Sequence, residues 1–257
     1  MKIFVTGGTG KLGQCLIPEL QKDSGVEVYA PPRRIFDITQ PSAVWQHMQR
    51  QKDIDVMVHC AAQTDVPGCE SDSDTAHMVN VLATSNLANF CSQLGWSFVY
   101  ISTDYVFNGE RGNYTESDVP SPINTYGHTK LCSEVAVQLA YHFHKDRYAI
   151  IRTSLKPLGE WPYPKAFTDI YSSADYVDVI AHEIALAIRL QVTGIIHIAT
   201  ERKSIYELAK KRTPNVGPMS RKDIKDVNLP FDVSLDVTRW ETLKKRIEEQ
   251  YCATQTG

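Results

Sequence analysis

Short apolar runs alternate with amphipathic helical patterns through the N-terminal half of the chain. The runs that have the length of a strand are residues 2–6, 26–30, 55–61, 96–102 and 148–152. Within them apolar residues follow one another without regular polar neighbours, which is typical of strands buried on both faces. Strands of this kind, when helices separate them, form a parallel sheet with a helical layer on each side. The sequence therefore predicts an α/β protein with a doubly wound parallel sheet.

The chain changes character near residue 155, where prolines and aromatic residues become frequent. We expect residues 1–154 to form the sheet domain and residues 155–257 to form a smaller lobe, from which the chain returns to the sheet. Helices are expected over residues 12–20, 41–48, 75–94, 125–143, 178–190, 204–208 and 238–249, a further strand over 194–199, and irregular structure over 213–235.

Charge, hydropathy and cysteine content limit the class of protein. Lys and Arg total 27 against 30 Asp and Glu, a formal net charge of −3, which excludes a strongly basic nucleic-acid binder. No apolar run approaches the roughly 18 residues that span a bilayer, so no membrane partner is expected. The six cysteines form no CxxC pair, which favours free thiols and a cytoplasmic location. The cysteines and histidines offer no metal site.

A glycine-rich segment at residues 7–13, GGTGKLG, joins the first predicted strand to the first predicted helix. Glycines at these spacings form a tight turn, let the backbone approach a pyrophosphate and let the helix pack on the strand. The free N–H groups of the helix then bind the phosphates. The glycines could instead serve the turn alone, but their place at the first strand–helix junction favours a Rossmann dinucleotide site. The residues expected to contact the dinucleotide here are Gly7, Thr9, Gly10, Lys11, Leu12 and Gly13.

Two arginines follow the second predicted strand, where an acidic residue would accept the ribose 2′-hydroxyl of NAD(H). The strand runs into Ala30-Pro31-Pro32-Arg33-Arg34, with no acidic residue at its end. Guanidinium groups bind phosphate with paired hydrogen bonds, so Arg33 and Arg34 favour the 2′-phosphate of NADP(H). A solvated basic turn is the alternative explanation. We expect NADP(H) to be preferred, with NAD(H) as the second cofactor.

Tyr126 and Lys130 stand four residues apart at the start of a predicted helix, so their side chains share one helix face. An ammonium beside a phenol stabilises the phenolate, which would lower the pKa of Tyr126 and suit it to acid–base catalysis. Thr103 follows the fourth predicted strand, at the sheet edge where ligands bind in open α/β folds. Its hydroxyl is expected to bind a substrate carbonyl oxygen beside Tyr126.

Four motifs occur in a characteristic order: the glycine loop, STDYVF at 102–107, PINTYGHTKLCSE at 122–134 and IRTS at 151–154. Together they resemble the extended short-chain dehydrogenase/reductase superfamily and, within it, the dTDP-4-dehydrorhamnose reductase family. The resemblance covers residues 1–154 well and the remaining residues loosely.

The resemblance implies an oxidoreductase of deoxysugar biosynthesis, which reduces the 4-keto group of a nucleotide-linked 4-keto-6-deoxy sugar with NAD(P)H. The family's Thr–Tyr–Lys triad falls on Thr103, Tyr126 and Lys130, and its substrate contacts fall on Asp104 and Tyr105. Its further cofactor contacts fall on Asp37, Ile38, Ala61, Ala62 and Gln63, together with Tyr126 and Lys130. A nucleotide sugar is then the expected small-molecule partner, and a homodimer is a candidate assembly.

Two departures from the family pattern leave other functions open. Leu155 stands where the family usually has tryptophan, and the segment after it is shortened. An epimerase that retains its nicotinamide cofactor would share the fold and the triad. A non-catalytic NADP-binding subunit, like the beta subunit of methionine adenosyltransferase, is the alternative from another class. A dehydratase is disfavoured, because Tyr105 follows Asp104 where a dehydratase carries a second carboxylate.

Overall fold

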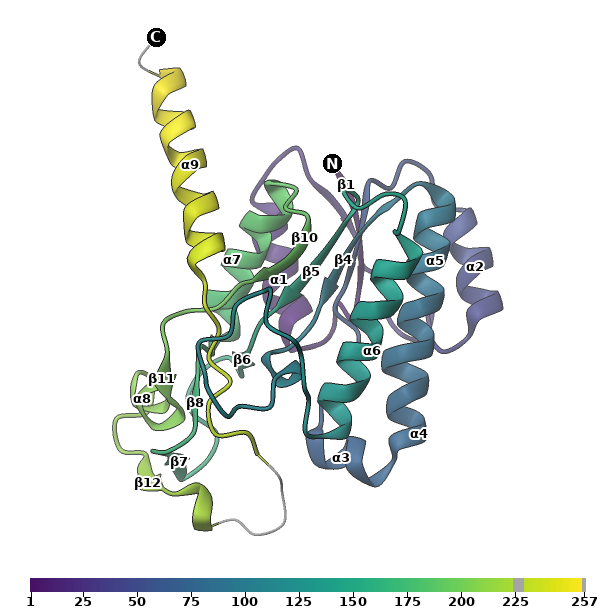
Figure 1. The fold of residues 1–257 in the computed structure, drawn as a ribbon. Coiled ribbons are helices and arrows are strands. Elements are labelled where there is room, and N and C mark those ends of the chain that lie inside the picture. The colour runs from purple at the N-terminus through teal and green to yellow at the C-terminus, as the bar shows by residue number, and fades with distance from the viewer. Residues whose placement is uncertain (224–228, 256–257) are drawn as a thin grey trace.

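Six parallel strands form the central sheet of the computed structural model, which describes residues 1–223 and 229–255 (Figure 1). Their order across the sheet is β10-β5-β4-β3-β1-β2. The strands are β1 (Lys2–Thr6), β2 (Glu27–Tyr29), β3 (Val56–His59), β4 (Ser97–Ile101), β5 (Tyr148–Arg152) and β10 (Gly194–His197). The predicted doubly wound parallel sheet is confirmed.

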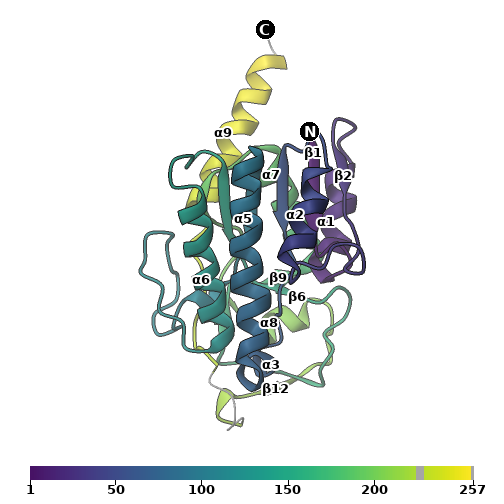
Figure 2. The same ribbon diagram turned by 90° about the vertical axis from the view of Figure 1, so that its right-hand side faces the viewer.

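Helices cover both faces of this sheet (Figure 2). On one face lie α1 (Lys11–Gln21) and α7 (Val177–Arg189), and on the other lie α2 (Pro41–Gln49), α5 (Ala83–Leu94) and α6 (Thr125–Ala140). Successive side chains of β1 point to opposite faces, so Ile3 and Val5 join the α1–α7 core while Phe4 joins the α2–α5–α6 core. Both faces of β1 are therefore buried, as its unbroken apolar run predicts.

The helix expected over residues 75–94 is interrupted by a π turn. The chain forms α3 (Val66–Ser71), α4 (Ser73–Ala76), a π-helical turn (His77–Leu82) and then α5. Buried Asn80 lies in the π turn, where its side-chain amide donates to the carbonyl of Gln63 and to Oγ1 of Thr129, at 3.1 and 2.9 Å. Its side-chain oxygen accepts the Gln63 N–H at 2.8 Å. The turn thus joins the loop after β3 to α6.

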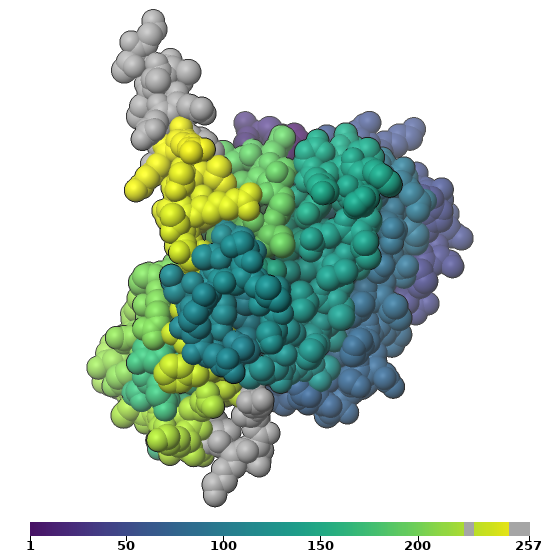
Figure 3. Space-filling model, in the orientation of Figure 1, coloured from purple at the N-terminus to yellow at the C-terminus, as the bar shows by residue number. Residues whose placement is uncertain are grey.

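Among the described residues, three short strand pairs and the helix α8 (Ile205–Lys210) lie outside the central sheet and pack against it, and we refer to them as the lobe (Figure 3). The pairs are β6 (Leu155–Lys156) with β9 (Asp175–Tyr176), β7 (Lys165–Phe167) with β12 (Gly217–Met219), and β8 (Tyr171–Ser172) with β11 (Lys203–Ser204). Helix α8 begins with a capping box between Ser204 and Glu207. Between the two parts of the lobe the chain returns to the sheet as α7 and β10.

Short 3₁₀ turns lie at Asp104–Val106 and Arg221–Asp223, and the last helix is α9 (Thr238–Gln255). Within the irregular segment expected over 213–235, residues 224–228 lie outside the described residues. Across the described ranges, no helix is long and apolar enough to cross a membrane.

Candidate active site

A cavity of about 680 Å³ opens at the carboxyl ends of the central strands. It lies beside the switch point of the sheet, where β2 and β3 flank β1 and the strand order reverses. The predicted site residues that line it are Gly7, Thr9, Gly10, Lys11, Leu12, Gly13, Arg33, Asp37, Ile38, Ala61, Ala62, Gln63, Thr103, Asp104, Tyr105, Tyr126 and Lys130. The structure therefore brings together residues that the sequence separates by more than a hundred positions.

Arg34 is the exception among the predicted cofactor residues, because its side chain is exposed and does not line the cavity. Residues 33–35 form a turn, so neighbouring side chains point in different directions. Arg33 lines the cavity, and its Nε lies 3.5 Å from Oδ2 of Asp37. Of the two arginines expected at the ribose 2′-phosphate, the structure places Arg33 at the cavity and Arg34 outside it.

The glycine loop has the close backbone packing that a dinucleotide site requires. Gly7 has φ of +71°, and a Cβ atom there would lie 2.7 Å from the backbone nitrogen of Ala61. A Cβ atom on Gly13 would lie 2.4 Å from the carbonyl oxygen of Gly7. Gly10 caps α1 without a side-chain hydrogen bond, so the first turn of the helix keeps N–H groups for a ligand. The loop and helix therefore fit the diphosphate of a dinucleotide.

Tyr126 lies in the first turn of α6, which Asn124 caps by accepting the N–H of Gly127 at 2.8 Å. A Cβ atom on Gly127 would lie 2.2 Å from the carbonyl oxygen of Tyr105, so this glycine lets α6 approach the segment after β4. Burial raises the pKa of Tyr126, and a hydrogen bond with Thr103 opposes the rise. The pKa of Tyr126 is therefore raised, whereas the sequence led us to expect that the Lys130 ammonium would lower it. The phenol is thus held in its protonated form.

Lys130 lies one turn after Tyr126 and is almost fully buried. Its Nζ donates to the carbonyl of Ile101 at 2.7 Å and lies 4.1 Å from the ring centre of Tyr100. Burial lowers the pKa of Lys130 to about 7, while the Glu134 carboxylate raises it. Lys130 can therefore gain and lose a proton near neutral pH.

Asp104 is 1% exposed and lies directly after Thr103. Its carboxyl group accepts hydrogen bonds from the Thr103 hydroxyl at 3.1 Å and from the Ser172 hydroxyl at 3.0 Å. Burial raises the pKa of Asp104, whereas the ammonium of Lys156 lowers it. Ser172 and Lys156 both come from the lobe, and the motif pattern gave no reason to choose either residue.

Glu134 and Arg152 form a buried ion pair between the elements that carry the active-site residues. Glu134 and Arg152 are 1% and 2% exposed, and Nη2 of Arg152 lies 2.7 Å from Oε2 of Glu134. The Ser102 hydroxyl donates to the same carboxylate at 2.5 Å. The pair thus joins α6 to the ends of β4 and β5. The motifs at 122–134 and 151–154 contain both partners, but sequence spacing does not show that they meet.

Comparison with known proteins agrees with this geometry. A sequence model of the RmlD substrate-binding domain family matches residues 1–156. The chain is 38% identical over 148 residues to the probable low-salt glycan biosynthesis reductase Agl14 of Haloferax volcanii, over 54% of this chain and 49% of that protein. It is 38% identical over 142 residues to methionine adenosyltransferase 2 subunit beta of Rattus norvegicus, over 53% of this chain and 42% of that protein. The chain thus spans about half of the length of these curated relatives.

Solved structures resemble the chain over a larger share of its length. The crystal structure of dTDP-4-dehydrorhamnose reductase from Bacillus anthracis in complex with NADP has a TM-score of 0.81 and is 29% identical, covering 94% of this chain and 92% of that one. The resemblance stated from the motifs is confirmed. The chain belongs to the RmlD substrate-binding domain family, within the extended short-chain dehydrogenase/reductases.

Proposed function

We propose that the protein is an oxidoreductase that uses NADPH, with NADH as the second cofactor, to reduce the 4-keto group of a nucleotide-linked 4-keto-6-deoxy sugar. The observation that carries the proposal is that Thr103, Tyr126 and Lys130 line the same cavity as the glycine loop. The Bacillus anthracis reductase, whose structure contains NADP, supports the choice of reaction and cofactor. A cytoplasmic location, a homodimer and the absence of a nucleic-acid partner stay predictions from the sequence.

In this proposal the cofactor, when bound, supplies the hydride that reduces the carbonyl carbon. Tyr126 donates its phenol proton to the carbonyl oxygen, and a raised pKa keeps that proton in place until the oxygen gains negative charge. When substrate binds, the Thr103 hydroxyl turns its proton from Asp104 to the carbonyl oxygen and holds that oxygen beside the phenol. Lys130, with a pKa of about 7, can return a proton to Tyr126 after each turnover. The carbonyl thus gains the hydride on carbon and one proton on oxygen, and solvent replaces that proton through Lys130, so the products are an alcohol and the oxidised cofactor.

The test is NADPH oxidation by the wild-type protein and by Tyr126→Phe, with a panel of 4-keto-6-deoxy nucleotide sugars. We expect Tyr126→Phe to lose about a hundredfold or more in kcat, because it removes the proton donor, and to bind NADPH as the wild type does. Tyr163→Phe is the matched control, because Tyr163 is 64% exposed and lies outside the cavity. It should keep wild-type activity.

Two results would contradict the proposal. Full activity of Tyr126→Phe would remove the assigned proton donor. NADPH binding without oxidation across the whole panel would instead favour a non-catalytic subunit; the Rattus norvegicus relative is named as a subunit.

A further inference from the structure

Lys156 is a cavity residue that the family motifs do not account for. It lies on β6, is half-buried and lines the same cavity as the glycine loop. Among the described residues, no carboxylate oxygen lies within ion-pair distance of its Nζ, and its ammonium makes no hydrogen bond to protein. The Asp104 carboxyl favours the charged form of Lys156 through space but does not contact it, so a partly desolvated ammonium here is costly unless a ligand supplies an anion in direct contact.

A second ammonium, that of Lys11, borders the same cavity. Lys11 is the first residue of α1 and follows the glycine loop. Burial lowers the pKa of Lys156, the Asp104 carboxyl raises it, and the Lys11 ammonium lowers it further. Lys11 and Lys156 line the same cavity, and each ammonium is unfavourable for the other. An anion between them would remove this repulsion and would also meet the N–H groups of the first turn of α1.

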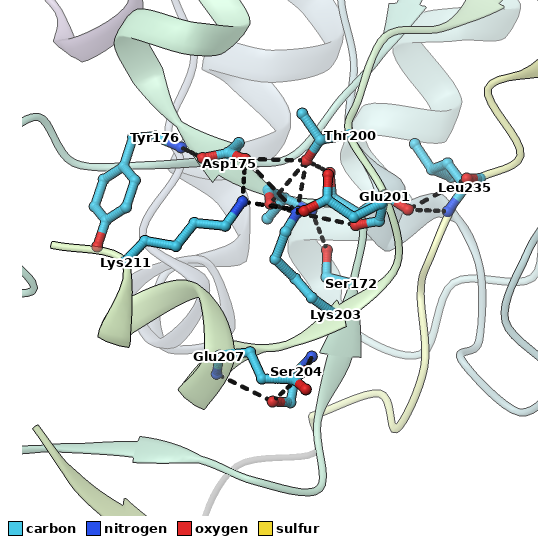
Figure 4. A network of polar contacts seen from close by, with 12 residues as sticks. Ser172, Asp175, Tyr176, Thr200, Glu201, Lys203, Ser204, Glu207, Lys211 and Leu235 are labelled. Atoms are coloured by element: carbon cyan, nitrogen blue, oxygen red, sulfur yellow. Dashed lines mark hydrogen bonds and ion pairs between the residues drawn. The ribbon is translucent and has the colours of Figure 1, made fainter. Parts of the chain in front are cut away.

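The backbone of Lys156 is fixed by the lobe. β6 pairs with β9, and the N–H of Asp175 donates to the carbonyl of Ser154 at 3.3 Å. Asp175 is in turn held by the ammonium of Lys203, at 3.6 Å, and by the Thr200 hydroxyl, at 3.2 Å (Figure 4). Because this network holds β9 in place, it also holds β6, so less conformational entropy is lost when Lys156 binds an anion.

We propose that Lys156 and Lys11 bind the diphosphate of the dinucleotide cofactor between them, so that the lobe closes the cofactor site. The inference rests on the proposed function and adds a residue of the lobe to the cofactor contacts. The diphosphate is the group expected at the start of α1, whereas the ribose 2′-phosphate is expected at Arg33, on the turn after β2. A nucleotide sugar also contains a diphosphate, so the experiment must separate the two sources.

The experiment compares Lys156→Met with the wild type in direct binding of NADPH, of 2′-phospho-ADP-ribose and of adenosine 2′-monophosphate. The first two ligands contain the diphosphate and the third does not. We expect Lys156→Met to weaken binding of the first two by about tenfold or more, the loss of one charge-assisted hydrogen bond, and to leave the third unchanged. Lys156→Arg should keep most of the affinity. Lys165→Met is the matched control, because Lys165 is an exposed lysine of the same lobe outside the cavity.

Equal NADPH affinity in Lys156→Met and the wild type, with melting temperatures within ~2 °C, overturns the proposal. Equal NADPH affinity with a raised KM for the nucleotide sugar also overturns it, and assigns Lys156 to the substrate diphosphate. A wild-type protein that binds no NADPH overturns the proposed function instead. If Lys156→Met does not fold, the Lys156→Arg variant decides, because loss of NADPH affinity despite a retained positive charge contradicts the proposal.

Discussion

Replacing Glu134 by glutamine should test the buried ion pair under the active site. Gln has the shape of Glu but no charge, so Glu134→Gln leaves the guanidinium of Arg152 buried without its counter-ion. In the wild type, Nε and Nη2 of Arg152 donate to Glu134 at 3.0 and 2.7 Å, and the Ser102 hydroxyl donates at 2.5 Å. In the variant an NH₂ group replaces one of the two acceptor oxygens. That group is itself a donor, so it cannot accept the hydrogen bonds that Arg152 and Ser102 donate to Glu134.

The expected loss follows from the burial of both partners. Removing one partner of a buried pair typically costs about 3–5 kcal/mol, because the other charge remains desolvated. For a chain of this size, 1 kcal/mol corresponds to roughly 2–4 °C in melting temperature. Glu134→Gln should therefore melt roughly 6 °C or more below the wild type, and urea titrations should show a lower midpoint with an unchanged slope.

A surface pair provides the matched control. Arg111 and Asp118 are 60% and 26% exposed, so Arg111→Gln should cost no more than about 1 kcal/mol. If Glu134→Gln melts no lower than Arg111→Gln, burial does not make the Glu134–Arg152 pair essential.

Three further predictions concern the cofactor site and acid stability. Arg33→Ala should weaken NADPH binding by about tenfold without changing NADH binding; equal losses for the two cofactors would remove Arg33 from the 2′-phosphate. Gly13→Ala would place a Cβ atom 2.4 Å from the carbonyl oxygen of Gly7, so it should weaken NADPH binding and lower the melting temperature, and wild-type values for both would contradict the packing argument. Burial lowers the pKa of His59 to about 3 from 6.5, so below pH 6.5 the unfolded chain binds a proton that the folded chain does not. The free energy of unfolding should therefore fall as the pH drops from 6.5 towards 3, by up to about 1.4 kcal/mol per pH unit. His59→Gln should flatten that decline in urea titrations at several pH values, and an unchanged decline would assign it to other groups.

The sequence predicts the parts of the fold that depend on local pattern. β1 and β5 have the bounds that their apolar runs predict, and Ser204 caps α8 as expected. The π turn before α5 was missed, because it depends on tertiary hydrogen bonds from Asn80 to Gln63 and Thr129, not on local propensity. Helical periodicity alone does not distinguish this turn from a continuous helix.

In the candidate site, too, the sequence predicts the features that depend on local spacing and does not predict those that depend on tertiary contacts. The glycine loop and the Tyr126–Lys130 pair follow from spacing on one element, and all of these residues line the cavity. The direction of the pKa shift of Tyr126 does not follow from spacing, because burial outweighs the neighbouring charge. Ser172 reaches Asp104 only because β8 of the lobe lies beside the end of β4, a contact between segments 68 residues apart. Contacts of this kind require coordinates.

Because of the path of the chain, the nucleotide-binding part cannot be separated from the lobe as a fragment with its core complete. The edge strand β10 and the helix α7, which buries one face of α1, are made by residues that follow β6 to β9 of the lobe. A fragment that ended after β5 would carry every dinucleotide contact predicted from the sequence but not Lys156. In it β5 would become an unpaired edge, and Leu12, Leu16 and Leu20 would lose the α7 side of their core. During synthesis, the nucleotide-binding half therefore reaches its final packing only after α7 and β10 have left the ribosome.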